Sequence, residues 1–150
     1  MIEGVKVVPL KQIPDERGTV MHMLKRTDPY FIQFGEIYFT TVHPGVVKGW
    51  HKHEGMTLNY SCVYGRIKLV LYDDREDSAT RGEVMELFLG PHDYQLVLIP
   101  TNIWNSFKGL GSETSIIANC ATEPHTKEFT DAIDPLSDSF IPYDWRHQSE

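Results

Sequence analysis

The chain has 150 residues, of which 41% are hydrophobic and 23% charged, so it can bury the core of about one ordinary domain. Fourteen Lys and Arg residues against 21 Asp and Glu residues give a formal net charge of −7, which argues against a nucleic-acid-binding protein with its basic face. No apolar run approaches the roughly 20 residues of a membrane span, and the first residues have no signal-peptide pattern, so we expect a cytoplasmic protein without a membrane or nucleic-acid partner.

The hydrophobic pattern along the chain is that of β-strands almost throughout. β-Branched and aromatic residues gather in short runs. The expected strands, in chain order, are residues 36–42, 57–64, 66–73, 84–89, 95–99 and 115–120. Turn residues separate these runs, among them Gly65 and Gly90-Pro91. No stretch of a dozen residues keeps a 3.6-residue period, so the pattern predicts an all-β sandwich or barrel.

The last 25 residues have a different composition. Pro124, Pro135 and Pro142 interrupt them, and proline has no backbone N–H to donate to a sheet ladder. We therefore expect an irregular tail with short helical turns after the last strand. With no linker or repeat along the chain, residues 1–150 are predicted to form a single domain.

His51 and His53 are the first candidates for chemistry. Residues at positions i and i+2 of a strand point to the same face, so both imidazoles would enter one cavity if that face lies inside a small barrel. Such a pair could bind a metal, act as base and orienting group, or hydrogen-bond in a polar core. A metal site usually needs three or four protein ligands. We therefore expect no metal or other cofactor, although these two residues would be the ligands if a metal were bound.

The surroundings of the pair resemble the first metal motif of the cupin superfamily, in which a Gly precedes His-x-His as Gly45 does here. The Glu of that motif has no counterpart, because its position falls at Leu58 or Thr57. In the second cupin motif, at residues 100–107, Asn105 stands where the ligand His would be. The resemblance implies a cupin-type jelly roll. A metal-dependent cupin, such as a small dioxygenase, stays open as one alternative.

Four motifs then occur in order along the chain. Residues 15–18 have the pattern Asp-x-Arg-Gly, residues 45–51 read Gly-Val-Val-Lys-Gly-Trp-His, residues 73–82 follow Asp-x-Arg-x-x-Ser-x-Thr-x-Gly, and residues 98–107 contain Ile-Pro and a later Phe. These motifs resemble the dTDP-4-dehydrorhamnose 3,5-epimerase family of cupin-fold nucleotide-sugar epimerases. The chain is identified as a short, divergent member. The resemblance implies a homodimer in which the N-terminal strand crosses to the partner subunit.

The resemblance also implies roles for individual residues. The family removes a proton next to the ketone of a nucleotide-linked 4-keto-6-deoxy sugar, and its base corresponds to His51. The family's Arg beside the sugar diphosphate is replaced by Lys48, and its N-terminal Arg, which often reaches phosphate across the dimer, corresponds to Arg17. The residues expected to line the sugar site or to act in it are His53, Asn59, Tyr60 and Asn105.

The chain differs from the family at catalytic positions. Leu58 also stands in register with the family's catalytic Lys, and residues 121–125 contain no counterpart of its Tyr acid. The acids left to consider are Glu123, His125 and Tyr60. Glu123 is also a candidate for contact with the substrate.

Trp50 and Trp104 flank the two cupin-like motifs. We consider them as candidates for substrate contact, since an aromatic wall could hold the sugar or the base. Packing in the core is the other interpretation, because large aromatic side chains are usually buried.

Two further alternatives remain open. The pair His51 and His53 also resembles the dTDP-4-keto-6-deoxyhexose 3,4-ketoisomerases, which move a proton on one face of the sugar and need no acid on the other. The replaced Lys and Tyr also fit a catalytically silent protein that binds a nucleotide sugar.

Overall fold

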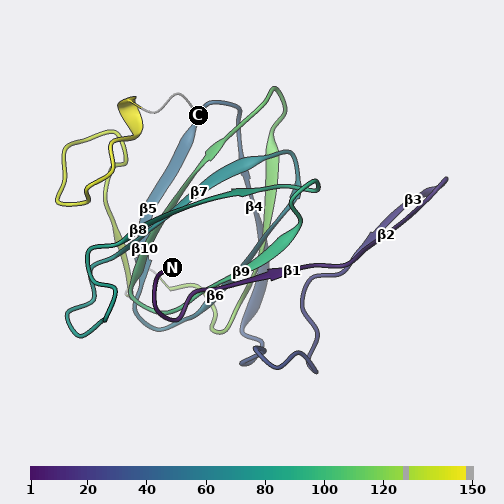
Figure 1. Ribbon diagram of the computed structural model, residues 1–150, viewed down its shortest axis with the longest axis horizontal. Helices are drawn as coiled ribbons and strands as arrows, with labels where there is room; N and C mark the ends of the chain where they lie inside the picture. Colours follow the sequence, from purple (N-terminus) through teal and green to yellow (C-terminus); the bar gives the residue numbers. More distant parts are fainter. Residues whose placement is uncertain (127–128, 148–150) are drawn as a thin grey trace.

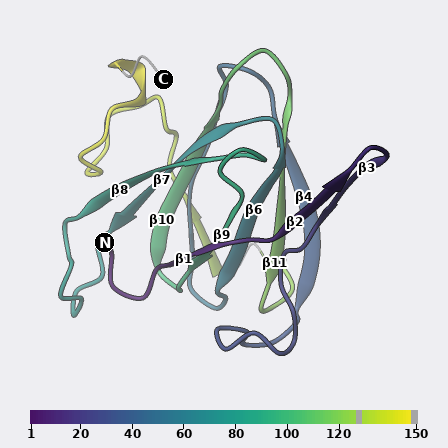
Figure 2. The same ribbon diagram turned by 45° about the vertical axis from the view of Figure 1, so that its right-hand side comes forward.

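Two five-stranded antiparallel sheets face each other in the computed structural model, which describes residues 1–126 and 129–147 (Figures 1 and 2). The strand order is β1-β9-β6-β11-β4 in the first sheet and β12-β5-β10-β7-β8 in the second, and β2 and β3 form a separate hairpin. The bounds are β1 (Lys6–Pro9), β2 (Gln12–Asp15), β3 (Gly18–Met21), β4 (Glu36–Val42), β5 (Val47–His53), β6 (Leu58–Tyr64), β7 (Ile67–Asp73), β8 (Val84–Leu89), β9 (Gln95–Ile99), β10 (Ile103–Gly109), β11 (Ser115–Ala121), β12 (Thr130–Ala132) and the 3-10 helix η2 (Trp145–His147). The predicted all-β jelly roll is confirmed. In the described part of the chain, no helix is long and apolar enough to cross a membrane.

The main core lies between the two sheets. Its buried side chains come from both inner faces, for example Leu58 and Tyr60 of β6 and Leu69 and Leu71 of β7. The residues between them in sequence point to the outer faces, as the pleat of a strand requires. The burial of these apolar side chains is the largest favourable contribution to folding.

A second cluster lies on the outer face of the second sheet and includes residues of the C-terminal tail. Its buried members are Trp50, Val70, Trp104, Ile141 and Trp145. The backbone of this tail runs beside the second sheet (Figure 2). The tail therefore replaces solvent over strands that would otherwise expose large aromatic side chains. The predicted irregular tail is confirmed, with β12 and η2 as its short regular elements.

Lys68 anchors this tail. Its Nζ lies 2.6 Å from Glu86 Oε2 and 5.4 and 5.8 Å from the ring centroids of Tyr143 and Trp145. The Tyr143 hydroxyl donates to the same carboxylate at 2.9 Å, and Trp145 Nε1 donates to Ser106 Oγ at 2.7 Å. Cation–π contact and a shared carboxylate thus hold the tail against β7 and β10.

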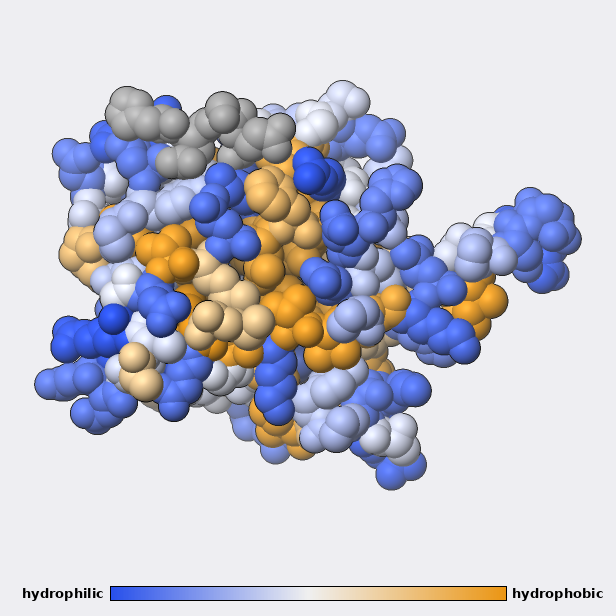
Figure 3. Space-filling view, in the orientation of Figure 1, coloured by the Kyte–Doolittle hydropathy of each residue, from blue (hydrophilic) through white to orange (hydrophobic). Residues whose placement is uncertain are grey.

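The N-terminal hairpin, β2 and β3, projects away from both sheets (Figures 1 and 2). We call residues 12–21 the arm. Arg17 lies at its turn, with Nη2 2.7 Å from Asp15 Oδ2. Ile13 and Val20 are exposed on the arm, and Figure 3 shows apolar surface there among hydrophilic residues. A two-stranded hairpin is marginally stable in water by itself, so the arm has the features of an element that packs on another surface.

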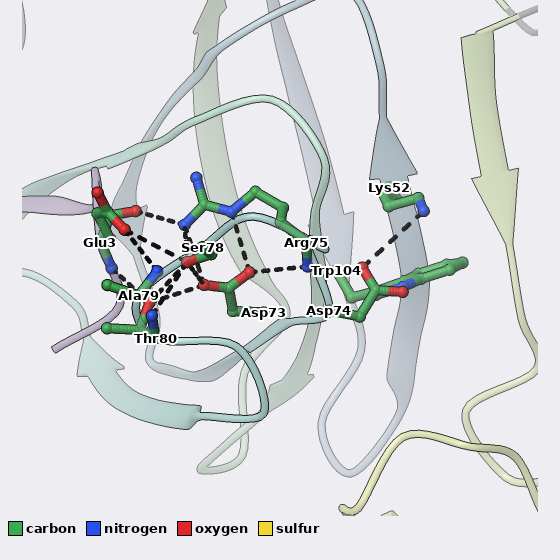
Figure 4. Close-up of polar contacts among 9 residues, drawn as sticks. All are labelled: Glu3, Lys52, Asp73, Asp74, Arg75, Ser78, Ala79, Thr80 and Trp104. Carbon is green, nitrogen blue, oxygen red and sulfur yellow. Dashed lines mark hydrogen bonds and ion pairs between the residues drawn. The ribbon is translucent and has the colours of Figure 1, made fainter.

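The turn between β7 and β8 is built around the carboxylate of Asp73, which is fully buried (Figure 4). It accepts hydrogen bonds from the backbone and guanidinium of Arg75 and from the hydroxyls of Ser78 and Thr80. Arg75 Nη2 also donates to the Glu3 carbonyl oxygen at 2.7 Å, which fastens the N-terminus. Burial alone would raise the pKa of Asp73, but the hydrogen bonds outweigh burial and hold this pKa well below its usual range.

We expect Asp73→Asn to lower the free energy of unfolding by about 3 kcal/mol, because it removes the charge that pairs with Arg75 and replaces one of the two acceptor oxygens by an NH2 donor. Urea unfolding at pH 7 measures this. Because the folded-state pKa of Asp73 is depressed, its contribution is present above about pH 4 and is lost as the pH falls further. The difference in the free energy of unfolding between wild type and Asp73→Asn should therefore become smaller below about pH 4.

The matched control is Asp77→Asn, which removes an exposed carboxylate from the same turn. It should change the stability by less than about 0.5 kcal/mol. A difference between wild type and Asp73→Asn that stays constant from neutral pH to about pH 3 would contradict the proposed role of the carboxylate.

Candidate functional site

The candidate site is built on the inner face of β5. The rings of His51 and His53 are stacked, with 6.4 Å between their centroids and 24° between their planes. His51 pairs across the ladder with Asn105 of β10, and the Asn105 side chain hydrogen-bonds to Tyr60 of the main core. The two histidines therefore share the face that is turned toward the first sheet.

A β-bulge interrupts the alternation of β5. His51 pairs with Asn105, but the next residue of β10, Ser106, pairs with Gly49, so Trp50 is the extra residue of the strand. Gly49 has φ +108°, and a Cβ at this position would lie 2.7 Å from the Asn105 carbonyl oxygen. Glycine is therefore required here, both for its backbone conformation and for the close approach of β10.

The bulge brings Lys48 to the side of the histidines, although strict alternation would place it on the opposite face. Lys48 pairs with Phe107 of the main core, whereas Val47 packs against the cluster beneath the tail. Lys48 Nζ donates to Thr40 Oγ1 at 2.9 Å and to the Thr41 carbonyl oxygen at 3.0 Å, both on β4. It is an exposed cation that bridges the two sheets beside the imidazoles.

His53 is buried, with 7% of its surface exposed. Its Nδ1 lies 3.0 Å from Oγ1 of Thr130, the residue opposite it in β12. Burial, together with the nearby His51 and His125, lowers the pKa of His53 to about 4. The imidazole is therefore neutral at pH 7.

His125 completes a cluster of three imidazoles. It lies on the exposed loop after β11, and its ring meets that of His53 edge-on, with 5.9 Å between centroids. Its backbone N–H donates to Glu36 Oε1 at 2.9 Å. Burial, His125 and Lys48 all lower the pKa of His51. Within residues 1–126 and 129–147, no three His, Cys, Asp or Glu side chains are arranged so that they could hold a metal ion.

Tyr60 and Asn105 lie behind His51. The Tyr60 hydroxyl donates to Asn105 Oδ1 at 3.3 Å, and Asn105 Nδ2 donates to the His51 carbonyl oxygen at 3.2 Å. Burial raises the pKa of Tyr60, so its phenol stays protonated. The phenol proton is donated to Asn105 Oδ1. Tyr60 and Asn105 thus support the backbone of β5 at His51.

Tyr38 and Asn119 are inner-face residues that sequence analysis did not single out. Asn119 Nδ2 donates to the Tyr38 hydroxyl oxygen at 2.9 Å, so Tyr38 accepts in this bond and keeps its own proton available. The alternation of β4 contains a signal for Tyr38, because the exposed Ile37 and Phe39 on either side of it imply that it points inward. Asn119 has no such signal in its largely apolar strand.

Trp50 and Trp104 lie on the opposite face of the second sheet. Both are buried in the cluster beneath the tail. Trp104 Nε1 donates to Asp74 Oδ2 at 3.0 Å, and Lys52 Nζ lies 5.1 Å from the centroid of its ring (Figure 4). The structure does not bring these two side chains to the histidines.

Asn59 and Glu123 also make other contacts. Asn59 points away from the main core, since its neighbours along β6 point into it, and its Nδ2 donates to the Cys120 carbonyl oxygen at 2.8 Å. Glu123 lies on the same loop as His125, but its carboxylate accepts a hydrogen bond of 2.6 Å from Gln33. Arg17 lies on the projecting arm, away from β5 (Figure 1).

A cavity of about 640 Å³ lies apart from the histidines, between the N-terminus and the turn after β7. Its lining residues are Glu3, Gly4, Lys52, Asp74, Arg75, Glu76, Asp77, Ser78 and Asn102. The basic groups of this lining have acidic partners, since Lys52 lies 4.0 Å from Asp74 and Arg75 lies 2.9 Å from Asp73. We therefore place the candidate site at the imidazoles of β5.

Comparisons with known proteins point to one family. The sequence profile of dTDP-4-dehydrorhamnose 3,5-epimerase matches residues 1–150. The chain is 38% identical over 145 residues to the probable low-salt glycan biosynthesis epimerase Agl13 of Haloferax volcanii, covering 95% of this chain and 89% of that protein. It is 31% identical over 146 residues to the spore coat polysaccharide biosynthesis protein SpsL of Bacillus subtilis, covering 97% of each.

A solved structure extends the similarity to the fold. The dTDP sugar isomerase of Desulfovibrio desulfuricans G20 superimposes with a TM-score of 0.94 and 40% sequence identity, covering 99% of this chain and 94% of that one. The family resemblance that the four sequence motifs indicated is thereby confirmed.

We expect the free energy of unfolding to fall as the pH drops from about 6.5 to about 4, in part because of His53. Its folded-state pKa of about 4 lies below the ordinary value of 6.5, so the unfolded chain takes up the proton first. Stability therefore rises with pH across this window. In urea unfolding at several pH values, the free energy of unfolding should depend less steeply on pH for His53→Gln than for the wild type. His22→Gln, at an exposed position, is the control; a wild-type slope in His53→Gln would contradict the prediction.

Proposed function

The chain belongs to the dTDP-4-dehydrorhamnose 3,5-epimerase family of carbohydrate epimerases, and on this premise we propose that it converts a nucleotide-linked 4-keto-6-deoxy sugar with His51 as base. One observation carries the proposal. The His51 ring lies on the inner face of β5 beside Lys48, and neither of its ring nitrogens hydrogen-bonds to another described residue. A base needs such a free nitrogen within reach of the substrate.

The electrostatics of the site suit proton removal next to a ketone. Burial and two neighbouring groups lower the pKa of His51, so the ring is neutral at pH 7 and can accept a proton. Lys48 supplies a positive charge on the same side, which we assign to the diphosphate of the substrate. A lysine acts there as a point charge and lacks the two-pronged geometry of an arginine.

His53 supports a second candidate function, a 3,4-ketoisomerase. That reaction moves a proton between two adjacent carbons on one face of the sugar. Two neutral imidazoles stacked on one strand face, 6.4 Å apart, match a transfer of this kind. The position of isotope exchange distinguishes this reaction from epimerisation.

We expect His51→Gln to slow proton exchange at the sugar by at least about 100-fold, because general-base catalysis is worth about 10²–10⁴-fold. Proton NMR in deuterated water with dTDP-4-keto-6-deoxyglucose measures the loss of the C3 and C5 signals. His22→Gln should exchange at the wild-type rate.

The other outcomes of this experiment identify the alternatives. Wild-type rates in His51→Gln would remove His51 as the base. Binding of the nucleotide without exchange in the wild-type protein, seen by saturation transfer, would favour a silent binding protein. Exchange that begins only after a divalent metal is added would favour a metal-dependent cupin.

We further propose that two copies of the chain form a homodimer through the arm. The outer face of β4, an edge strand of the first sheet, exposes Ile37 and Phe39, the latter with 64% of its surface accessible. The arm exposes Ile13 and Val20, and among the described strands β2 and β3 pair only with each other. If the arm packs on the partner, Arg17 can reach the partner's diphosphate site, as the family resemblance implies.

Mixing two inactive variants tests this exchange of arms. In a mixed dimer of His51→Gln and Arg17→Ala, one site would have both defects and the other would be intact. Random mixing makes about half of the dimers mixed, so we expect about one quarter of the wild-type activity to return. Unfolding and refolding the two variants together provides the mixture, and exchange NMR measures the activity. No recovery, in a mixture shown to be dimeric by sedimentation, would contradict a role of Arg17 across the dimer.

A further inference from the structure

We infer that Thr130 is a positioning residue, which holds His53 in the tautomer protonated at Nδ1 and so keeps Nε2 as a second proton acceptor of the site. This inference deepens the proposed function and rests on it. Thr130 belongs to the tail, 77 residues after His53 in the chain.

The tautomer follows from the hydrogen bonds of one hydroxyl group. Thr130 Oγ1 lies 2.9 Å from the Thr126 carbonyl oxygen and 3.0 Å from His53 Nδ1. A carbonyl oxygen can only accept, so the single hydroxyl proton is donated to Thr126. The bond to His53 can then form only if Nδ1 carries a proton and donates it to Oγ1. In a neutral imidazole this leaves Nε2 with its lone pair.

Nε2 of His53 has no hydrogen-bond partner within the described residues, because the bond of Nδ1 to Thr130 is the one that this side chain makes there. The Asn59 Oδ1 is the one side-chain nitrogen or oxygen in the described part of the chain that is both sealed from solvent and unpaired. Nε2 is therefore not sealed. It combines a lone pair, a fixed ring plane and the lack of a protein partner, which are properties of a positioned base.

The backbone of the tail fixes the place of the hydroxyl. β12 is paired with β5, so that Thr130 lies opposite His53 and Asp131 lies opposite Lys52. Trp50 and Ile133 exchange two backbone hydrogen bonds of 2.8 and 3.0 Å just beyond this ladder. The hydroxyl therefore stands in position before any substrate binds.

His51 and His53 differ in this respect. No described residue hydrogen-bonds to the His51 ring, so the protein does not select its tautomer, whereas Thr130 selects that of His53. We assign His53 a step in the second candidate reaction, the 3,4-ketoisomerisation: a carbon–hydrogen bond next to the ketone breaks, the proton goes to Nε2, and the electron pair forms the enolate. The proton returns from Nε2 to carbon when the ketone reforms.

The test compares Thr130→Val, which removes the hydroxyl at nearly equal volume, with Thr130→Ser, which retains it. The first readout is ¹⁵N–¹H long-range correlation NMR of the His53 ring in the free protein. We expect an unprotonated Nε2 in the wild type and in Thr130→Ser, and partial or full protonation of Nε2 in Thr130→Val. A protonated Nε2 in the wild type, or an unchanged tautomer in Thr130→Val, would overturn the inference.

The second readout is the rate of sugar proton exchange. Thr130→Val should lower kcat by about 10–100-fold with little change in KM, and Thr130→Ser should restore most of it. The control is Thr114→Val, which breaks a similar contact of 3.0 Å between Thr114 and His43 outside the site, and it should keep the wild-type rate. A wild-type rate in Thr130→Val would overturn the positioning role. Absence of exchange in the wild type would overturn the proposed function alone, because the tautomer is measured without substrate.

Discussion

The bulge at Gly49 and Trp50 is the constraint on which the site depends, because it lets one strand serve two faces. Regular alternation would turn Lys48 toward the cluster beneath the tail, where a lysine would displace apolar packing. With the extra residue, Lys48 joins His51 and His53 on the inner face while Trp50 stays in the outer cluster. The close approach of β10 permits only glycine at position 49. Both the packing of Trp50 on the outer face and the position of Lys48 on the inner face thus depend on Gly49.

The C-terminal tail links stability to protonation. Its aromatic residues bury the outer face of the second sheet and are held by Lys68 and its partner Glu86. The same segment begins with β12, whose Thr130 reaches the inner face of β5. The apolar cluster therefore stabilises a backbone ladder, and the ladder sets the hydrogen-bond partner of a buried imidazole. Neither apolar burial nor a hydrogen bond would by itself give His53 both a low pKa and a defined tautomer.

The sequence predicted those strands whose residues show a β-strand pattern by themselves, without reference to neighbouring strands. The six expected strands match β4, β6, β7, β8, β9 and β11 to within one residue at each end, because alternation follows from the pleat. It did not predict β10, since Asn105, Ser106 and Lys108 interrupt its apolar residues. A bulge depends on the approach of a neighbouring strand, and an aromatic residue such as Trp104 has the same local pattern in a core as in a pocket. Only the course of the tail distinguishes the two.

The protonation states within the site bear on the reaction. Neutral imidazoles with lowered pKa values are bases at pH 7, so the inner face of β5 offers proton acceptors and few donors. The proton of Tyr60 is committed to Asn105, whereas Tyr38 accepts from Asn119 and keeps its own proton. A reaction on one sugar face can return the proton from the imidazole that took it. A reaction on both faces requires a separate donor, and of these two phenols only Tyr38 has the free proton that such a reaction needs.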